Sequence, residues 1–72
     1  MVYPNPTQGN VNVVAPGMNH ITVLNALGQV VYDATVTTES LTLDLGQYGD
    51  GIYLVRVAGE NGVSVRRVSV VK

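Results

Sequence analysis

The chain has 72 residues, with four Lys and Arg against five Asp and Glu, and a formal net charge of −1. This length allows one small domain, in which folding buries only about 60% of the surface of the unfolded chain. The absence of cysteine excludes disulfides and thiolate metal sites, and the lack of a basic excess argues against a nucleic-acid-binding protein. We therefore expect a single domain over residues 1–72, with Met1 compatible with an added start residue.

Short apolar runs of period two follow one another along the chain, and no window has sustained helical periodicity. In chain order the alternating sets are Val11 and Val13; Ile21 and Val23; Val30, Tyr32 and Ala34; Leu41, Leu43 and Leu45; and Tyr53, Val55 and Val57. Turn-forming residues separate these runs at 16–17, 25–28, 37–40, 46–51 and 59–62, and Gly28 is expected to take a positive φ. The spacing predicts an all-β fold, an immunoglobulin-like β-sandwich of about seven short antiparallel strands.

The last run changes phase in its middle. Val63 and Val65 lie at odd positions, whereas Val68 and Val70 lie at even positions. One extra residue would let both pairs face the core, so we predict a β-bulge at Arg66-Arg67. The alternative is that the two ends of this strand are buried on different faces.

Candidate chemistry is sparse. His20 is expected on a solvated strand face, because nothing in the sequence supplies the partner that catalysis needs. Asp44 and Asp50 are interpreted as turn formers, with weak calcium binding at Asp50-Gly51 as a minor alternative. The three tyrosines Tyr3, Tyr32 and Tyr48 are assigned to packing, with a sugar-binding platform as the alternative. We expect no catalytic residue, metal site or cofactor.

Two features point to roles other than catalysis. Tyr53 follows a glycine-containing turn, which is the setting of a tyrosine corner in immunoglobulin-like sandwiches, so a structural role is expected. Arg66, Arg67 and Lys72 make the C-terminal run basic. These cations either protect an edge strand from aggregation or present a basic strand to a receptor, by charge or by strand addition.

Several spaced fragments occur together in a fixed order. They are Tyr3-Pro4-Asn5-Pro6 with Gly9; Ile21 to Asn25 with Gly28 and Val31; Leu43-Asp44-Leu45 with Gly51-Ile52-Tyr53; and Arg67, Val68 to Val71 and Lys72. With these fragments the chain resembles the type A C-terminal sorting domain of cargo proteins of the type IX secretion system, also called the Por system. The family often has Lys where this chain has Arg66-Arg67.

The resemblance implies a removable secretion signal and no enzyme. It implies a cargo domain fused on the N-terminal side, passage through the periplasm of a Gram-negative bacterium, and export to the cell surface through an outer-membrane translocon. It also implies recognition by a shuttle protein and a cell-surface sortase, with cleavage before Tyr3, in sequence upstream of this chain. The alternative function is an accessory module, similar to fibronectin type III or carbohydrate-binding domains, that stays on a secreted enzyme.

Two sets of residues follow as expected site residues. The candidate recognition residues are Arg66, Arg67, Val68, Val70 and Lys72. The residues of the expected structural motifs are Pro4, Asn5, Pro6, Gly28, Asp44, Gly51 and Tyr53. Exposed sheet edges also allow a strand-exchanged homodimer.

Overall fold

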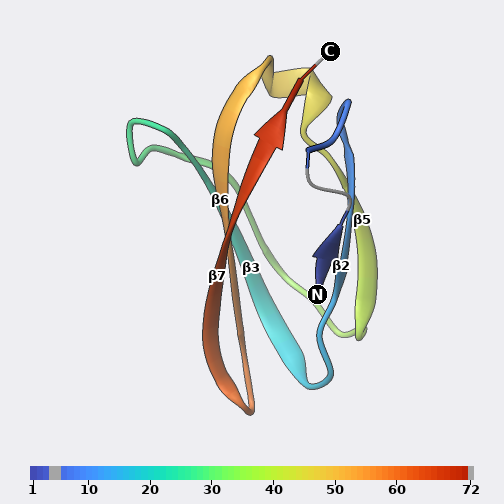
Figure 1. The fold of residues 1–72 in the computed structure, drawn as a ribbon. Helices are drawn as coiled ribbons and strands as arrows, with labels where there is room; N and C mark the ends of the chain where they lie inside the picture. The colour runs from blue at the N-terminus through green and yellow to red at the C-terminus, as the bar shows by residue number, and fades with distance from the viewer. Residues whose placement is uncertain (4–5, 72) are drawn as a thin grey trace.

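The computed structural model describes residues 1–3 and 6–71, and within them the chain folds into seven strands (Figure 1). The strands are β1 (Val2–Tyr3), β2 (Asn10–Val14), β3 (Met18–Asn25), β4 (Val30–Thr35), β5 (Ser40–Asp44), β6 (Gly51–Gly59) and β7 (Gly62–Val70). A single 3-10 turn, η1 (Gly46–Tyr48), connects β5 to β6. The prediction of an all-β domain with about seven short strands is confirmed.

The strands form two antiparallel sheets. One sheet has the order β1-β2-β5 and the other has the order β4-β3-β6-β7. Their inner faces pack on each other, as in an immunoglobulin-like sandwich (Figure 1). The arrangement leaves β7 and β4 at the edges of the larger sheet, which places the C-terminal strand at the side of the molecule.

Period-two alternation builds the core between the sheets. The fully buried side chains include Val11 and Val13 of β2, Ile21 and Val23 of β3, and Val55 of β6, each with no exposed surface. Further core residues are Met18, Leu43, Leu45, Tyr53, Val57, Val68 and Val70. Branched aliphatic side chains dominate this core, in agreement with their preference for pleated surfaces.

Strand β4 departs from the predicted pattern. The set Val30, Tyr32 and Ala34 was expected on one face, but Val30 is 58% exposed and Val31 packs against the core. The register explains the difference, because Val23 pairs with Tyr32 while the next residue, Leu24, pairs with Val30. The extra residue on β4 shifts its alternation at this point.

The predicted β-bulge at Arg66-Arg67 is wrong. Strand β7 pairs with β6 in unbroken register, from Gly51 opposite Val70 to Gly59 opposite Gly62. The two valine pairs therefore point to opposite faces of the sheet. The expected alternative, burial on both faces, is also incomplete. Val68 and Val70 are buried, whereas Val63 and Val65 are 56% and 49% exposed. The outer face of this sheet is covered by solvent, so Val63 and Val65 point into water and not into a second core.

Candidate functional site

The C-terminal strand carries the expected recognition residues on different surfaces. Arg66 lies opposite Val55 and Arg67 lies opposite Leu54, and both arginine side chains are exposed. Val68 and Val70 are 0% and 2% exposed, so their side chains belong to the core of the folded domain. Lys72 lies outside the described residues. Among residues 1–3 and 6–71, the candidate recognition residues with exposed side chains are therefore the two arginines.

The segment after the Tyr-Pro-Asn-Pro motif lies against the end of β7. The amide of Thr7 donates to the carbonyl oxygen of Ser69 at 2.9 Å, and the amide of Val71 donates to the carbonyl oxygen of Thr7 at 2.8 Å. Thr7 and Val70 thereby form a parallel bridge. Pro6 of the motif is exposed, and Pro4 and Asn5 lie outside the described residues. Thr7 thus lies at the outer edge of β7, whereas β1 pairs with β2 in the smaller sheet.

The hydroxyl of Thr7 fixes the turn that follows. Thr7 is only 5% exposed, and its Oγ1 donates to the carbonyl oxygen of Asn10 at 2.6 Å. The same oxygen accepts from the amide of Gly9 at 3.1 Å. Gly9 in turn accepts from the amide of Leu45, which ties this turn to the end of β5. Sequence reasoning missed Thr7; its position directly after two prolines, with Gly9 two residues on, is the signal for a side-chain-stabilised turn.

Tyr53 has the contact expected of a tyrosine corner. Its hydroxyl donates to the carbonyl oxygen of Gly49, four residues upstream, at 2.8 Å. The ring is buried in the core and lies 6.4 Å from the ring of Tyr48, at an interplanar angle of 48°. This bond holds the connection between η1 and β6 against the core, so Tyr53 has a structural role.

Three other expected motif residues, Gly28, Asp44 and Gly51, lie in a turn or at a strand end. Asp44 accepts from the amide of Gly46 at 3.0 Å through Oδ1, which confirms its assignment as a turn former. Gly28 and Gly51 have φ angles of 83° and 144°, in the range that favours glycine, as expected for Gly28. Tyr32 and Tyr48 border one small groove between β4 and β5, whereas Tyr3 lies on β1. The three tyrosines therefore do not form one platform.

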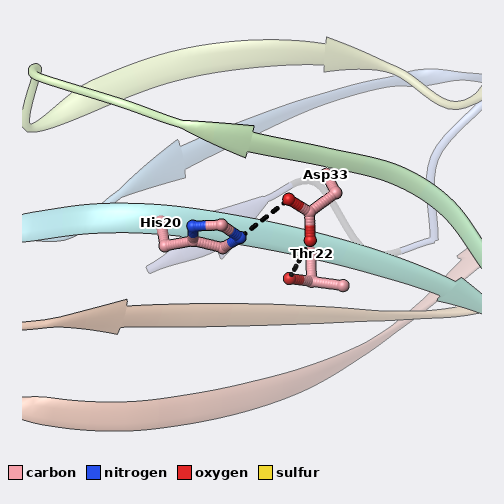
Figure 2. A network of polar contacts seen from close by, with 3 residues as sticks. All are labelled: His20, Thr22 and Asp33. Carbon is pink, nitrogen blue, oxygen red and sulfur yellow. Dashed lines mark hydrogen bonds and ion pairs between the residues drawn. The ribbon is translucent and has the colours of Figure 1, made fainter.

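His20 belongs to a polar network on the outer face of the larger sheet (Figure 2). Its Nε2 lies 2.8 Å from Oδ1 of Asp33, and the hydroxyl of Thr22 donates to Oδ2 of the same carboxylate at 3.0 Å. The hydrogen bond with His20, supported by that from Thr22, lowers the pKa of Asp33 from its usual value of 3.8. Arg56, which lies opposite Thr22 on β6, adds a favourable charge. His20 and Asp33 are 37% and 49% exposed, so this is a solvated cross-strand pair.

Within residues 1–3 and 6–71, no three His, Asp or Glu side chains lie close enough to hold a metal ion together. The single helical turn that the structure describes is far from the length and hydropathy of a membrane-crossing helix. The surface features that could contact a partner are the exposed arginines, the exposed valines and the strand edges.

Comparison with known proteins gives one clear relationship. The family model described as the secretion system C-terminal sorting domain matches residues 1–72, which is the whole sequence. No curated protein matches the chain. Members of this family are C-terminal sorting signals of type IX secretion cargo, which implies export to the cell surface or the extracellular space. The seven-stranded sandwich with a basic, edge-lying last strand therefore belongs to the family of secretion system C-terminal sorting domains.

Proposed function

We propose that this domain acts as a folded docking module, which delivers a cargo fused on its N-terminal side and catalyses no reaction of its own. The observation that supports the proposal most directly is the match of the sorting-domain family over residues 1–72. A domain with a compact core, no buried polar side-chain atom left without a partner among the described residues, and solvated charges is suited to recognition as a rigid shape.

The proposed route passes through the periplasm to the outer-membrane translocon of the type IX system. A shuttle protein then collects the cargo, and a cell-surface sortase removes the domain by cleavage before Tyr3. Residues 2 and 3, on the cleavage side of the domain, pair with β2 of the smaller sheet, whereas Thr7 pairs with the end of β7. A receptor bound at the end of β7 would therefore contact the segment around Thr7, which follows the cleavage region.

We further propose that Arg66 and Arg67 are the side chains of β7 that a receptor contacts on the folded domain. Both are exposed and belong to the edge strand of the larger sheet. Val68 and Val70 support this surface from within, because they anchor the same strand in the core. A guanidinium group offers paired donors to a carboxylate, which favours an acidic receptor surface.

The test is export of a reporter enzyme fused to the N-terminal end of the domain in a bacterium that has the type IX system. The intact fusion should reach the cell surface, and mass spectrometry of the mature reporter should show that the domain over residues 1–72 has been removed. The variant without residues 1–72 should stay in the periplasm. Delivery of this variant to the surface would contradict the proposed function, and a mature reporter that keeps the domain would favour a retained binding module.

The arginines are tested in the same fusion with Arg66→Gln and Arg67→Gln together. We expect the reporter to accumulate in the periplasm while the melting temperature of the isolated domain stays within a few degrees of that of the parent chain, because both side chains are exposed. Glu39→Gln is the matched control, since it removes one exposed charge of the opposite sign in the loop before β5. Normal export of the double variant would contradict a role for the arginines.

A further inference from the structure

The outer edge of β7 is divided into two halves. At the C-terminal half, Thr7 occupies the edge through its bonds with Ser69 and Val71. At the N-terminal half, from Gly62 to Arg66, β6 pairs with the inner side of β7, and no other strand within residues 1–3 and 6–71 pairs with its outer side. All residues from 60 to 67 are exposed. Figure 1 shows this half at the hairpin end of β6 and β7, away from the C-terminus.

The backbone of this half is oriented for a further strand. In a regular antiparallel strand the amide and carbonyl groups of successive residues point alternately to the two sides. The carbonyl of Ser69 and the amide of Val71 point to the outer edge, where they meet Thr7. Because the register of β7 is unbroken, the amides of Val65 and Val63 point to the same edge.

Natural edge strands are commonly protected by a bulge, a proline or a charged side chain, most often lysine. The half from Gly62 to Arg66 has no proline, no lysine and no register shift, and its one charged side chain is Arg66. Within this half, Nη1 of Arg66 donates to the carbonyl oxygen of Val65 at 3.3 Å, a long and solvent-exposed hydrogen bond. A bond of this kind is readily exchanged for a bond from an incoming strand.

The side chains around this edge combine positive charge with exposed apolar surface. Val63 and Val65 are 56% and 49% exposed on the outer face, and Arg56 lies directly opposite Val65. Arg66 lies on the inner face, opposite Val55. The only carboxylate in the hairpin formed by β6 and β7 between positions 51 and 70 is Glu60, at its tip. An extended segment with alternating acidic and apolar residues complements both properties.

We propose that the edge of β7 from Gly62 to Arg66 binds an extended, acidic polypeptide segment of a partner protein by strand addition. Main-chain bonds to Val63 and Val65 would supply the pairing, and the arginines would select acidic side chains. The inference rests on the proposed function, because the partner that carries this segment is taken to be part of the export machinery.

The first test uses the unmodified domain and a blocked octapeptide of alternating Val and Glu as the probe. Titration followed by NMR and amide exchange should shift the amide signals of Val63 and Val65 and slow their exchange. A blocked octapeptide of alternating Val and Lys is the control and should leave these amide signals and their exchange unchanged. Protection at β4 instead, or equal binding of the two peptides, would overturn the proposal. So would protection of the same amides by a second copy of the domain, seen as concentration-dependent dimerisation without peptide.

The second test uses Val65→Pro, which removes an edge-facing amide and no bond to β6. Val65→Thr is the matched control, because it keeps the amide and the branched shape. The proline variant should lose peptide binding and should leave the reporter fusion in the periplasm, while the threonine variant should retain both activities. Melting curves show whether both variants are folded. If Val65→Pro is unfolded, the peptide titration of the unmodified domain alone tests strand addition.

The two hypotheses fail in different ways. Surface delivery of Val65→Pro, while the fusion without residues 1–72 remains in the periplasm, would overturn strand addition and leave the proposed function standing. Surface delivery of the fusion that lacks the domain would overturn the proposed function itself.

Discussion

Thr7 and Val70 pair in parallel, so the segment after the Tyr-Pro-Asn-Pro motif lies directly beside the last strand. The pairing links two parts of the domain that are more than 60 residues apart in the sequence. Strand β7 is thereby held by β6 on one side and, at its end, by Thr7 on the other. The position of residues 69–71 therefore depends on the hydrogen bonds that Thr7 makes near the start of the domain.

Thr7→Val should destabilise the domain although it preserves side-chain shape. The change removes the donor to Asn10 and the acceptor for the amide of Gly9, in a position that is 5% exposed. An unsatisfied buried group of this kind costs about 1–3 kcal/mol in the free energy of unfolding. Urea denaturation measures the loss. The exposed Thr37→Val is the control and should change stability by less than about 0.5 kcal/mol. Equal stability of the two variants would contradict the role of the Thr7 hydroxyl.

Tyr53→Phe isolates the tyrosine corner, because it deletes the hydroxyl and keeps the buried ring. The lost bond to Gly49 should lower the free energy of unfolding by about 0.5–1.5 kcal/mol, which a thermal melt detects as a lower melting temperature. Export of a fused reporter should persist. Tyr3→Phe, at a side chain that is 44% exposed, should leave the melt unchanged. Loss of export with an unchanged melting temperature would refute a purely structural role for Tyr53.

Sequence patterns predicted the core well and the edges poorly. Alternation correctly placed Val11, Val13 and Tyr53 inside, because each lies in a strand whose other face is solvated. It fails at Arg66-Arg67, where the phase change predicts a bulge but β7 pairs with β6 in unbroken register. The period of a strand shows which residues share a face, but the burial of that face depends on the neighbouring sheet. That dependence made Val63 and Val65 exposed rather than buried.

The parallel contact of Thr7 was also invisible to sequence reasoning. It joins an irregular segment to a strand, so no alternation marks it, and the contact arises only once both sheets are packed. The pairing of His20 with Asp33 is a similar case, because it depends on the register between β3 and β4. By contrast, the Tyr53 bond is local in sequence, and the preceding glycines predicted it.

Asp33 should make the stability of the domain sensitive to acid. Its pKa in the folded state is lowered by the hydrogen bond with His20, so the folded chain binds a proton less readily than the unfolded chain. The carboxylate therefore stabilises the fold above its unfolded pKa, and this contribution is lost as the pH falls through the folded pKa. Asp33→Asn should lower the melting temperature at pH 7 and flatten its decline as the pH falls below about 4.

Melting curves at a series of pH values measure this effect. Glu39→Gln is the control, because it removes a carboxylate from an exposed loop and should retain the shape of the wild-type profile. Thr22→Val tests the second hydrogen bond to the same carboxylate and should change the profile in the same direction as Asp33→Asn, by a smaller amount. An Asp33→Asn profile parallel to that of the parent chain would show that the pair makes no contribution.

Substitution of Gly59 should destabilise the domain strongly, because Gly59 lies where β6 and the start of β3 pair at very close range. A Cβ atom on Gly59 would lie 2.4 Å from the carbonyl oxygen of Gly17 and 2.7 Å from Cα of Met18. Both are backbone atoms, so the strands must separate, and Gly59→Ala should cost about 2 kcal/mol or more in the free energy of unfolding. Gly28→Asn is the contrasting variant, since Gly28 has a φ of 83° but open space around its Cβ position. Asn tolerates this backbone conformation, so the loss there should stay below about 1 kcal/mol. Denaturation of both variants in urea compares the two costs, and a larger loss for Gly28→Asn would mean that backbone conformation limits this fold more than the close approach of β6 to β3.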